Sequence, residues 1–69
     1  MYFIYRLHIN GITIHIGKCK NMNKRYINHK SDCYNKNRRN YNSYKYLCIR
    51  QLNISKKQFY NNVKMEILY

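Results

Sequence analysis

The segment FIYRLHINGITIHIG, residues 3–17, carries the strongest structural signal in this 69-residue chain. Apolar residues stand at every second position in both halves of the segment. This period of two predicts β-strands over residues 2–7 and 12–16, with Gly17 ending the second strand. Because Asn10-Gly11 lies between the two runs, they are predicted to form a tight hairpin.

The segment after the hairpin has the features of a helix. Asn21 is suited to cap a helix that runs from Met22 to about Lys30. Met22, Tyr26 and His29 are spaced by four and three residues, so they are predicted to share one face of this helix.

A polar and basic stretch, residues 31–41, predicts an exposed loop. After it, Ser43 is suited to cap a second helix over residues 44–52. The residues that recur there at helical spacing are Tyr44, Leu47, Cys48 and Gln51 or Leu52.

The last segment has the alternation of a strand. Val63, Met65 and Ile67 alternate with Lys64 and Glu66, which predicts a third strand. The order β-β-α-α-β then predicts an α+β fold, in which a small three-stranded antiparallel sheet has two helices on one side or at one end. No internal repeat or linker divides the chain, so residues 1–69 are predicted to form a single domain.

The charge balance indicates a polyanionic partner. Fourteen Lys and Arg residues stand against Asp32 and Glu66, which gives a formal net charge of +12. Self-repulsion of this size destabilises a compact domain unless a polyanion neutralises it. Nucleic acid is therefore the expected partner, and an anionic membrane surface is the alternative. Two carboxylates are too few for a carboxylate cage around Mg²⁺ or Ca²⁺, and they nearly exclude catalysis by paired carboxylates.

Other features of the composition bear on the compartment. The longest apolar run, Met1–Tyr5, is closed by Arg6 and is too short for a membrane span or a signal peptide. Cys19, Cys33 and Cys48 are odd in number and lie 14 and 15 residues apart, which does not make a disulfide framework. We therefore expect an intracellular protein that is not secreted and does not enter a membrane. Asn, Ile, Lys and Tyr make up 38 residues, which indicates an AT-rich genome, with a virus among the candidate sources.

Most of the chain resembles the GIY-YIG nuclease family. That family pairs a Gly-Ile-Tyr strand with a Tyr-Ile-Gly strand across a turn that often contains Asn-Gly, and it places an Arg and a His four residues apart on its first helix. The matching segments here are Phe3-Ile4-Tyr5, His15-Ile16-Gly17 with Lys18, Lys24-Arg25-Tyr26-Ile27-Asn28-His29, Asn42-Ser43-Tyr44 and Lys64-Met65-Glu66-Ile67-Leu68. The resemblance implies a GIY-YIG-like fold and hydrolysis of a DNA phosphodiester with Mg²⁺ or Mn²⁺.

The resemblance also implies roles for four catalytic residues. Tyr5 matches the first tyrosine of the family, which helps to activate water or to orient the phosphate. Arg25 matches the family's arginine, which would hold the non-bridging phosphate oxygens. His29 matches the family's histidine, within reach of a proton in transit. His15 replaces the second tyrosine, and an imidazole with a pKa near about 6.5 suits proton transfer at neutral pH better than a phenol near about 10. Gly17 would let the backbone and the helix approach the strand closely.

Two departures from the family affect catalysis. Phe3 stands in the place of the first glycine. In the family, a helix after the third strand carries the metal-binding glutamate, whereas this sequence ends at Tyr69 and Glu66 does not match that position. The resemblance therefore implies a C-terminally incomplete domain with no metal ligand of its own. We expect a catalytically impaired module that still binds nucleic acid. The alternatives are an active small endonuclease completed by a partner chain and a non-functional gene fragment.

Basic residues interleaved with tyrosines form the predicted nucleic-acid-binding surface, with DNA as the expected ligand. Cations neutralise phosphates, and aromatic rings stack on exposed bases. The basic residues with this predicted role are Lys18, Lys24, Lys36, Arg38, Arg39, Lys45 and Arg50. The alternative to a binding surface is that these residues form a solvated basic loop.

Two His-x-x-x-Cys pairs, His15 with Cys19 and His29 with Cys33, contain four residues of the types that bind zinc. The first pair straddles the predicted end of a strand, and neither pair has the close Cys-x-x-Cys spacing of zinc fingers. No metal site is therefore predicted.

Overall fold

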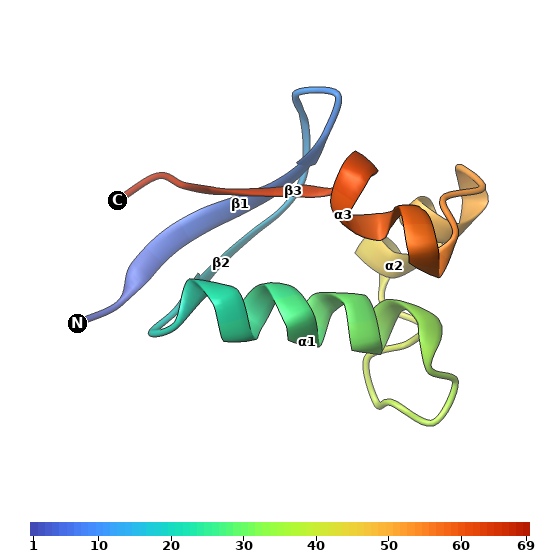
Figure 1. Cartoon of the computed structure of the whole chain (residues 1–69). Coiled ribbons are helices and arrows are strands. Elements are labelled where there is room, and N and C mark those ends of the chain that lie inside the picture. Colours follow the sequence, from blue (N-terminus) through green and yellow to red (C-terminus); the bar gives the residue numbers. More distant parts are fainter.

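Three antiparallel strands and the helices beside them make up the chain in a computed structural model that describes residues 1–69. The elements are β1 (Phe3–Ile9), β2 (Ile12–Cys19), α1 (Met22–Tyr34), α2 (Tyr44–Gln51), the 3₁₀ helix η1 (Lys56–Gln58), α3 (Phe59–Asn62) and β3 (Lys64–Ile67). The strands form one sheet in the order β2-β1-β3. Helix α1 runs along the sheet, and α2 and α3 lie toward one end of it (Figure 1). The predicted α+β fold and its element order are confirmed, and η1 and α3 are short additions that the sequence patterns did not predict.

The hairpin turn is the one that the Asn-Gly pair predicts. Ile9 pairs with Ile12, which leaves a loop of two residues. Asn10 and Gly11 have φ angles of 51° and 80°, the left-handed conformation that a tight hairpin turn of this kind requires and that Asn and Gly adopt most readily.

A β-bulge changes the register of the hairpin beyond the turn. His8 pairs with Thr13, but Leu7 pairs with His15, so Ile14 is an extra residue on β2. Without it, Ile14 would lie opposite Leu7 and His15 would lie opposite Arg6, on the other face of the sheet. The bulge therefore turns His15 to the same face as Leu7 and leaves Ile16 61% exposed on the opposite face.

Strand β2 does not end at Gly17, contrary to the sequence prediction. It continues to Cys19, and Gly17 pairs with Tyr5. A Cβ atom at position 17 would lie 2.7 Å from the Tyr5 hydroxyl oxygen. The glycine therefore makes room for a tyrosine side chain inside the sheet instead of breaking the strand.

Helix α1 begins as predicted and ends later. The side-chain oxygen of Asn21 accepts a hydrogen bond from the backbone N–H of Lys24 (3.0 Å), which confirms the N-cap. The helix continues past Lys30 to Tyr34, because Cys33 is fully buried and the Tyr34 hydroxyl donates a hydrogen bond to the Ile54 carbonyl (2.6 Å). The predicted exposed loop over residues 31–41 is thus wrong for its first four residues.

Helix α2 has nearly the predicted bounds but buries a different face. Tyr46 and Ile49 are buried, whereas Tyr44 is 80% exposed and Leu47 is exposed as well. The stripe predicted from the spacing of Tyr44 and Leu47 therefore faces solvent. Tyr46 is held inside by a hydrogen bond to His29 of α1, and this contact between helices sets the rotation of α2.

The core lies between the sheet and the helices, and every α-helix contributes to it. Its buried members are Tyr5, Leu7, Ile9, Cys19, Cys33, Tyr46, Ile49, Ile54, Phe59 and Val63. A core of ten residues is small, as expected for a chain of this length. None of the helices has both the length and the apolar character that a membrane crossing requires.

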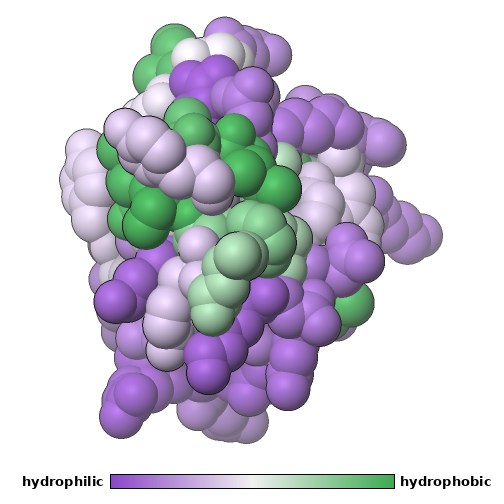
Figure 2. Space-filling view, turned by 90° about the vertical axis from the view of Figure 1, so that its left-hand side faces the viewer, coloured by the Kyte–Doolittle hydropathy of each residue, from purple (hydrophilic) through white to green (hydrophobic).

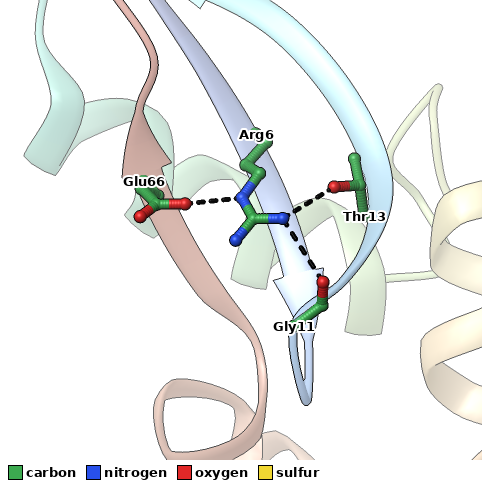
Figure 3. A network of polar contacts seen from close by, with 4 residues as sticks. All are labelled: Arg6, Gly11, Thr13 and Glu66. Atoms are coloured by element: carbon green, nitrogen blue, oxygen red, sulfur yellow. Dashed lines mark hydrogen bonds and ion pairs between the residues drawn. The ribbon is translucent and has the colours of Figure 1, made fainter.

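The opposite face of the sheet carries a polar network centred on Arg6 (Figure 3). Its Nε donates to the Glu66 carboxylate on β3 at 2.5 Å. One terminal nitrogen of the guanidinium donates to the Thr13 hydroxyl (3.0 Å) and to the Gly11 carbonyl (3.3 Å). Arg6 therefore connects the third strand to the hairpin turn.

Candidate functional site

Four aromatic side chains from four elements meet between the sheet and the helices. Tyr5 comes from β1, His15 from β2, His29 from α1 and Tyr46 from α2. The ring centroids of Tyr5, His15 and His29 form a triangle with sides of 6.0, 5.7 and 5.8 Å, and the Tyr46 ring lies 5.9 Å from that of His29. We call these four residues the tyrosine–histidine cluster. Three of the four residues predicted to be catalytic are thus brought together.

Hydrogen bonds join three members of this cluster, with His29 between Tyr5 and Tyr46. The Tyr5 hydroxyl lies 2.8 Å from His29 Nε2, and the Tyr46 hydroxyl lies 2.6 Å from His29 Nδ1. A neutral imidazole has one N–H donor and one acceptor, so it donates to one hydroxyl and accepts from the other. If a proton enters at one hydroxyl and another leaves from the other hydroxyl, His29 changes its tautomer without any movement of heavy atoms.

Burial and positive charge keep His29 neutral. Its side chain is buried, and desolvation is the main cause that lowers its pKa from 6.5 to about 3, with further contributions from His15, Lys45 and Arg25. Burial also lowers the pKa of His15, again with Lys45 and Arg25 acting in the same direction. Both imidazoles are therefore neutral at neutral pH, and they are weaker bases than a free histidine.

Two cations flank the cluster. Arg25 lies one helical turn before His29 and is exposed, so it adjoins the cluster without entering it. Lys45 is partly buried, with its ammonium 4.7 Å from the centre of the Tyr46 ring. Burial and the nearby Arg25 lower the pKa of Lys45, whereas Asp32 acts in the opposite direction. This end of the cluster therefore favours an anion.

Neither carboxylate of the chain belongs to the cluster. Asp32 pairs with Arg38 (3.0 Å), and Glu66 pairs with Arg6 on the opposite face of the sheet. No three His, Cys, Asp or Glu side chains lie close enough together to hold a metal ion. The cluster contains phenols and imidazoles, whereas Mg²⁺ prefers oxygen ligands that include carboxylates. The donor set therefore does not fit the Mg²⁺ or Mn²⁺ that the family resemblance implies.

The residues predicted to bind nucleic acid fall into three groups. Lys18 and Lys24 line a hollow beside Arg25 at the start of α1. Lys36, Arg38 and Arg39 are exposed in the loop between the two long helices, where Arg38 pairs with Asp32. Lys45 adjoins the cluster.

Arg50, the last of these predicted residues, is engaged within the protein. It donates to the Cys33 carbonyl at 2.5 Å, and its guanidinium lies 3.8 Å from the centre of the Tyr41 ring. Both contacts connect α2 with the end of α1 and the following loop. These contacts give Arg50 a structural role within the protein.

Sequence reasoning missed three residues of these sites. Tyr46 does not lie on the predicted face of α2. Its spacing of three residues from Ile49 nevertheless indicates that the two side chains share a face. Tyr2 and Lys20 also line the hollow at the start of α1, and no motif marks either residue.

Comparisons of the chain with protein-family models, curated proteins and solved structures return no significant match.

Proposed function

We propose that this chain is a nucleic-acid-binding domain that resembles a GIY-YIG nuclease and has impaired hydrolytic activity, with DNA as its expected partner. The partly buried edge of the tyrosine–histidine cluster at His15 and the cations beside it would contact the phosphate backbone, whereas the other three members of the cluster are buried beneath this edge. Arg25 and Lys45 would neutralise phosphate oxygens, and the neutral His15, which is only partly buried, would donate or accept hydrogen bonds there.

The observation that carries this proposal is the distribution of charge. Both acids form their ion pairs with other residues, so neither Arg25 nor Lys45 has a carboxylate in direct contact, although Asp32 is close enough to act on the pKa of Lys45. At a net charge of +12, the chain repels itself most where such cations gather. A phosphate backbone would remove this repulsion and release counterions as it binds.

The expectation of impaired hydrolysis has a separate basis. The cluster includes groups able to transfer a proton, but no carboxylate reaches them to anchor a divalent cation near a scissile phosphate. A proton relay without that electrostatic stabilisation supplies only part of what phosphodiester hydrolysis requires. An active nuclease would need a further carboxylate beside the cluster.

The test measures DNA binding as a function of salt. Retention of a labelled duplex should weaken steeply between low and moderate salt, with a linear dependence of log K on log salt concentration. Replacing Arg25 and Lys45 by Gln should lower affinity more than replacing the exposed Lys56 and Lys57 by Gln, which removes the same charge. Affinity that is weak and insensitive to salt would contradict the proposal and favour a non-functional fragment.

The same protein preparation should be tested on supercoiled plasmid with Mg²⁺ or Mn²⁺. We expect no nicking above that of an Arg25→Ala variant purified in parallel. Nicking that is lost in both Arg25→Ala and Tyr5→Phe would show that the cluster is catalytic and would replace the proposal by the endonuclease alternative.

A further inference from the structure

The start of α1 borders a hollow with a volume of about 580 Å³ that lies beside the tyrosine–histidine cluster. Its walls are formed by Tyr2, Lys18, Cys19, Lys20, Asn21, Lys24, Arg25 and Asn28. Figure 2 shows the end of the molecule that carries both termini, and hydrophilic surface covers its lower part, at the level of α1. The most strongly hydrophobic surface in this view gathers higher up, with smaller green groups among the hydrophilic surface below.

The four cations of the hollow stand close together without a compensating acid. The ammonium groups of Lys18 and Lys20 lie 4.9 and 5.2 Å from the centre of the Tyr2 ring, which holds both of them by cation–π attraction. Asp32 and Glu66 are paired elsewhere. In the free protein, these charges therefore repel one another.

Helix α1 adds to this positive potential. Lys24 and Arg25 lie in its first turn, and no acidic residue is present there. Cations are unfavourable at a helix N-terminus, because the helix dipole is positive at that end. The four cations, the helix dipole and the concave shape of the hollow therefore all favour an anion at the same place.

We propose that this hollow is a phosphate-binding subsite formed by Lys18, Lys20, Lys24 and Arg25. This subsite adds a specific phosphate contact to the proposed function. The subsite proposal rests on that function, because the expected source of the phosphate is a nucleic-acid strand. A hollow of about 580 Å³ falls within the size range of small-molecule sites and has room for the sugar attached to the phosphate. Arg25 also acts on the pKa of His15 and His29, so it connects the hollow with the cluster. A strand whose phosphate occupies the hollow would reach the cluster past Arg25.

The first experiment compares two double variants with the same net charge. Lys18→Gln with Lys24→Gln removes two cations from the hollow, and Lys56→Gln with Lys57→Gln removes two exposed cations from η1. In fluorescence anisotropy with a labelled single-stranded oligonucleotide, we expect the first variant to bind about tenfold more weakly than the second, because charge-assisted hydrogen bonds are lost only there. Equal losses of affinity would overturn the subsite.

Asn21→Asp separates binding from folding. An aspartate retains the N-cap and adds a negative charge at the start of α1, so the variant should be at least as stable as the wild type in urea. The same negative charge should weaken binding of the oligonucleotide severalfold if a phosphate enters the hollow. A stable Asn21→Asp variant with unchanged affinity would contradict the proposal.

A second measurement identifies the source of the phosphate. Amide NMR shifts of residues 22–25 are followed at constant ionic strength with a 5′-phosphorylated strand, the same strand with a 5′-hydroxyl, and inorganic phosphate. Equal shifts with both strands would show that an internal phosphate occupies the hollow. Larger shifts with the 5′-phosphorylated strand would show that the terminal phosphate occupies it. Shifts with inorganic phosphate, but no binding of either strand, would keep the subsite and refute the proposed function. Shifts absent in all three titrations would refute the subsite, even if the strands bind elsewhere.

Discussion

Gly17 is the residue on which the packing of the cluster depends most directly. A Cβ atom there would lie 2.7 Å from the Tyr5 hydroxyl oxygen, closer than real contacts allow, and 3.0 Å from His15 Nε2, which is tighter than most real contacts. We expect Gly17→Ala to lower the free energy of unfolding by about 1 to 3 kcal/mol, the usual range for overpacking a core. Urea denaturation monitored by circular dichroism measures this change.

Removing the Tyr5 hydroxyl provides the control for this prediction. In a Tyr5→Phe background the nearest clashing atom is absent, so Gly17→Ala should cost less than it does in the wild type. If the two substitutions are simply additive, the cost at position 17 does not come from the Tyr5 hydroxyl.

His29 makes stability depend on pH. It is neutral in both the folded and unfolded states above its ordinary pKa of 6.5. Between pH 6.5 and about 3, the unfolded chain takes up a proton at His29 that the folded chain does not bind, so the stability of the fold decreases as the pH is lowered. This effect amounts to at most about 1.4 kcal/mol for each pH unit within the window.

The pH dependence is measured by urea denaturation of the wild type and of His29→Gln at several pH values. The variant should be less stable at pH 7, because the hydrogen bonds to Tyr5 and Tyr46 are changed, but its stability should fall less steeply toward pH 4. Parallel curves for the two proteins would show that His29 does not titrate as inferred here.

Among the elements, β3 depends most on long-range contacts. It has four residues, lies at the edge of the sheet and follows the short helix α3. Its backbone pairs with β1, and the Arg6–Glu66 ion pair adds a side-chain connection on the outer face (Figure 3). An isolated strand of this length has little stability, so these contacts hold it in place.

Replacing Arg6 by Met should therefore loosen β3. We expect faster amide hydrogen exchange at Met65 and Ile67 than in the wild type, and a loss of stability of about 1 kcal/mol, because the ion pair is partly exposed. Arg39→Met removes the same charge from the exposed loop and should leave exchange in β3 unchanged. Similar exchange in both variants would mean that backbone pairing alone holds the strand.

At the level of the whole molecule, a small core and a large positive charge oppose each other. The ten buried apolar residues favour the compact state, and the net charge of +12 opposes it. The two acids form ion pairs with Arg6 and Arg38, neither of which lines the hollow. The cations that line the hollow have no ion pair with either acid, and it is there that an anionic ligand is proposed.

Features that depend on neighbouring residues could be predicted from the sequence. The Asn10-Gly11 turn, the Asn21 cap and the alternation of residues 63–67 are each specified within a few positions, because turn conformation, capping and pleating are local properties of the backbone. The element order and the α+β class followed from these signals. The end of α1 and the buried face of α2 were missed, because contacts with distant segments determine both.

The candidate site shows the same division most clearly. Tyr5, His15, Arg25 and His29 were recognisable as chemical groups from their order in the sequence, but alternation along β2 permits two opposite phases. Only the pairing of β2 with β1, with Ile14 as an extra residue, turns His15 toward His29 and the isoleucine at 16 away from it. Tyr46 joins the cluster because α2 packs with that side chain against His29. The residue types and the strands are therefore encoded locally, whereas the face on which those residues meet is set by long-range pairing and packing.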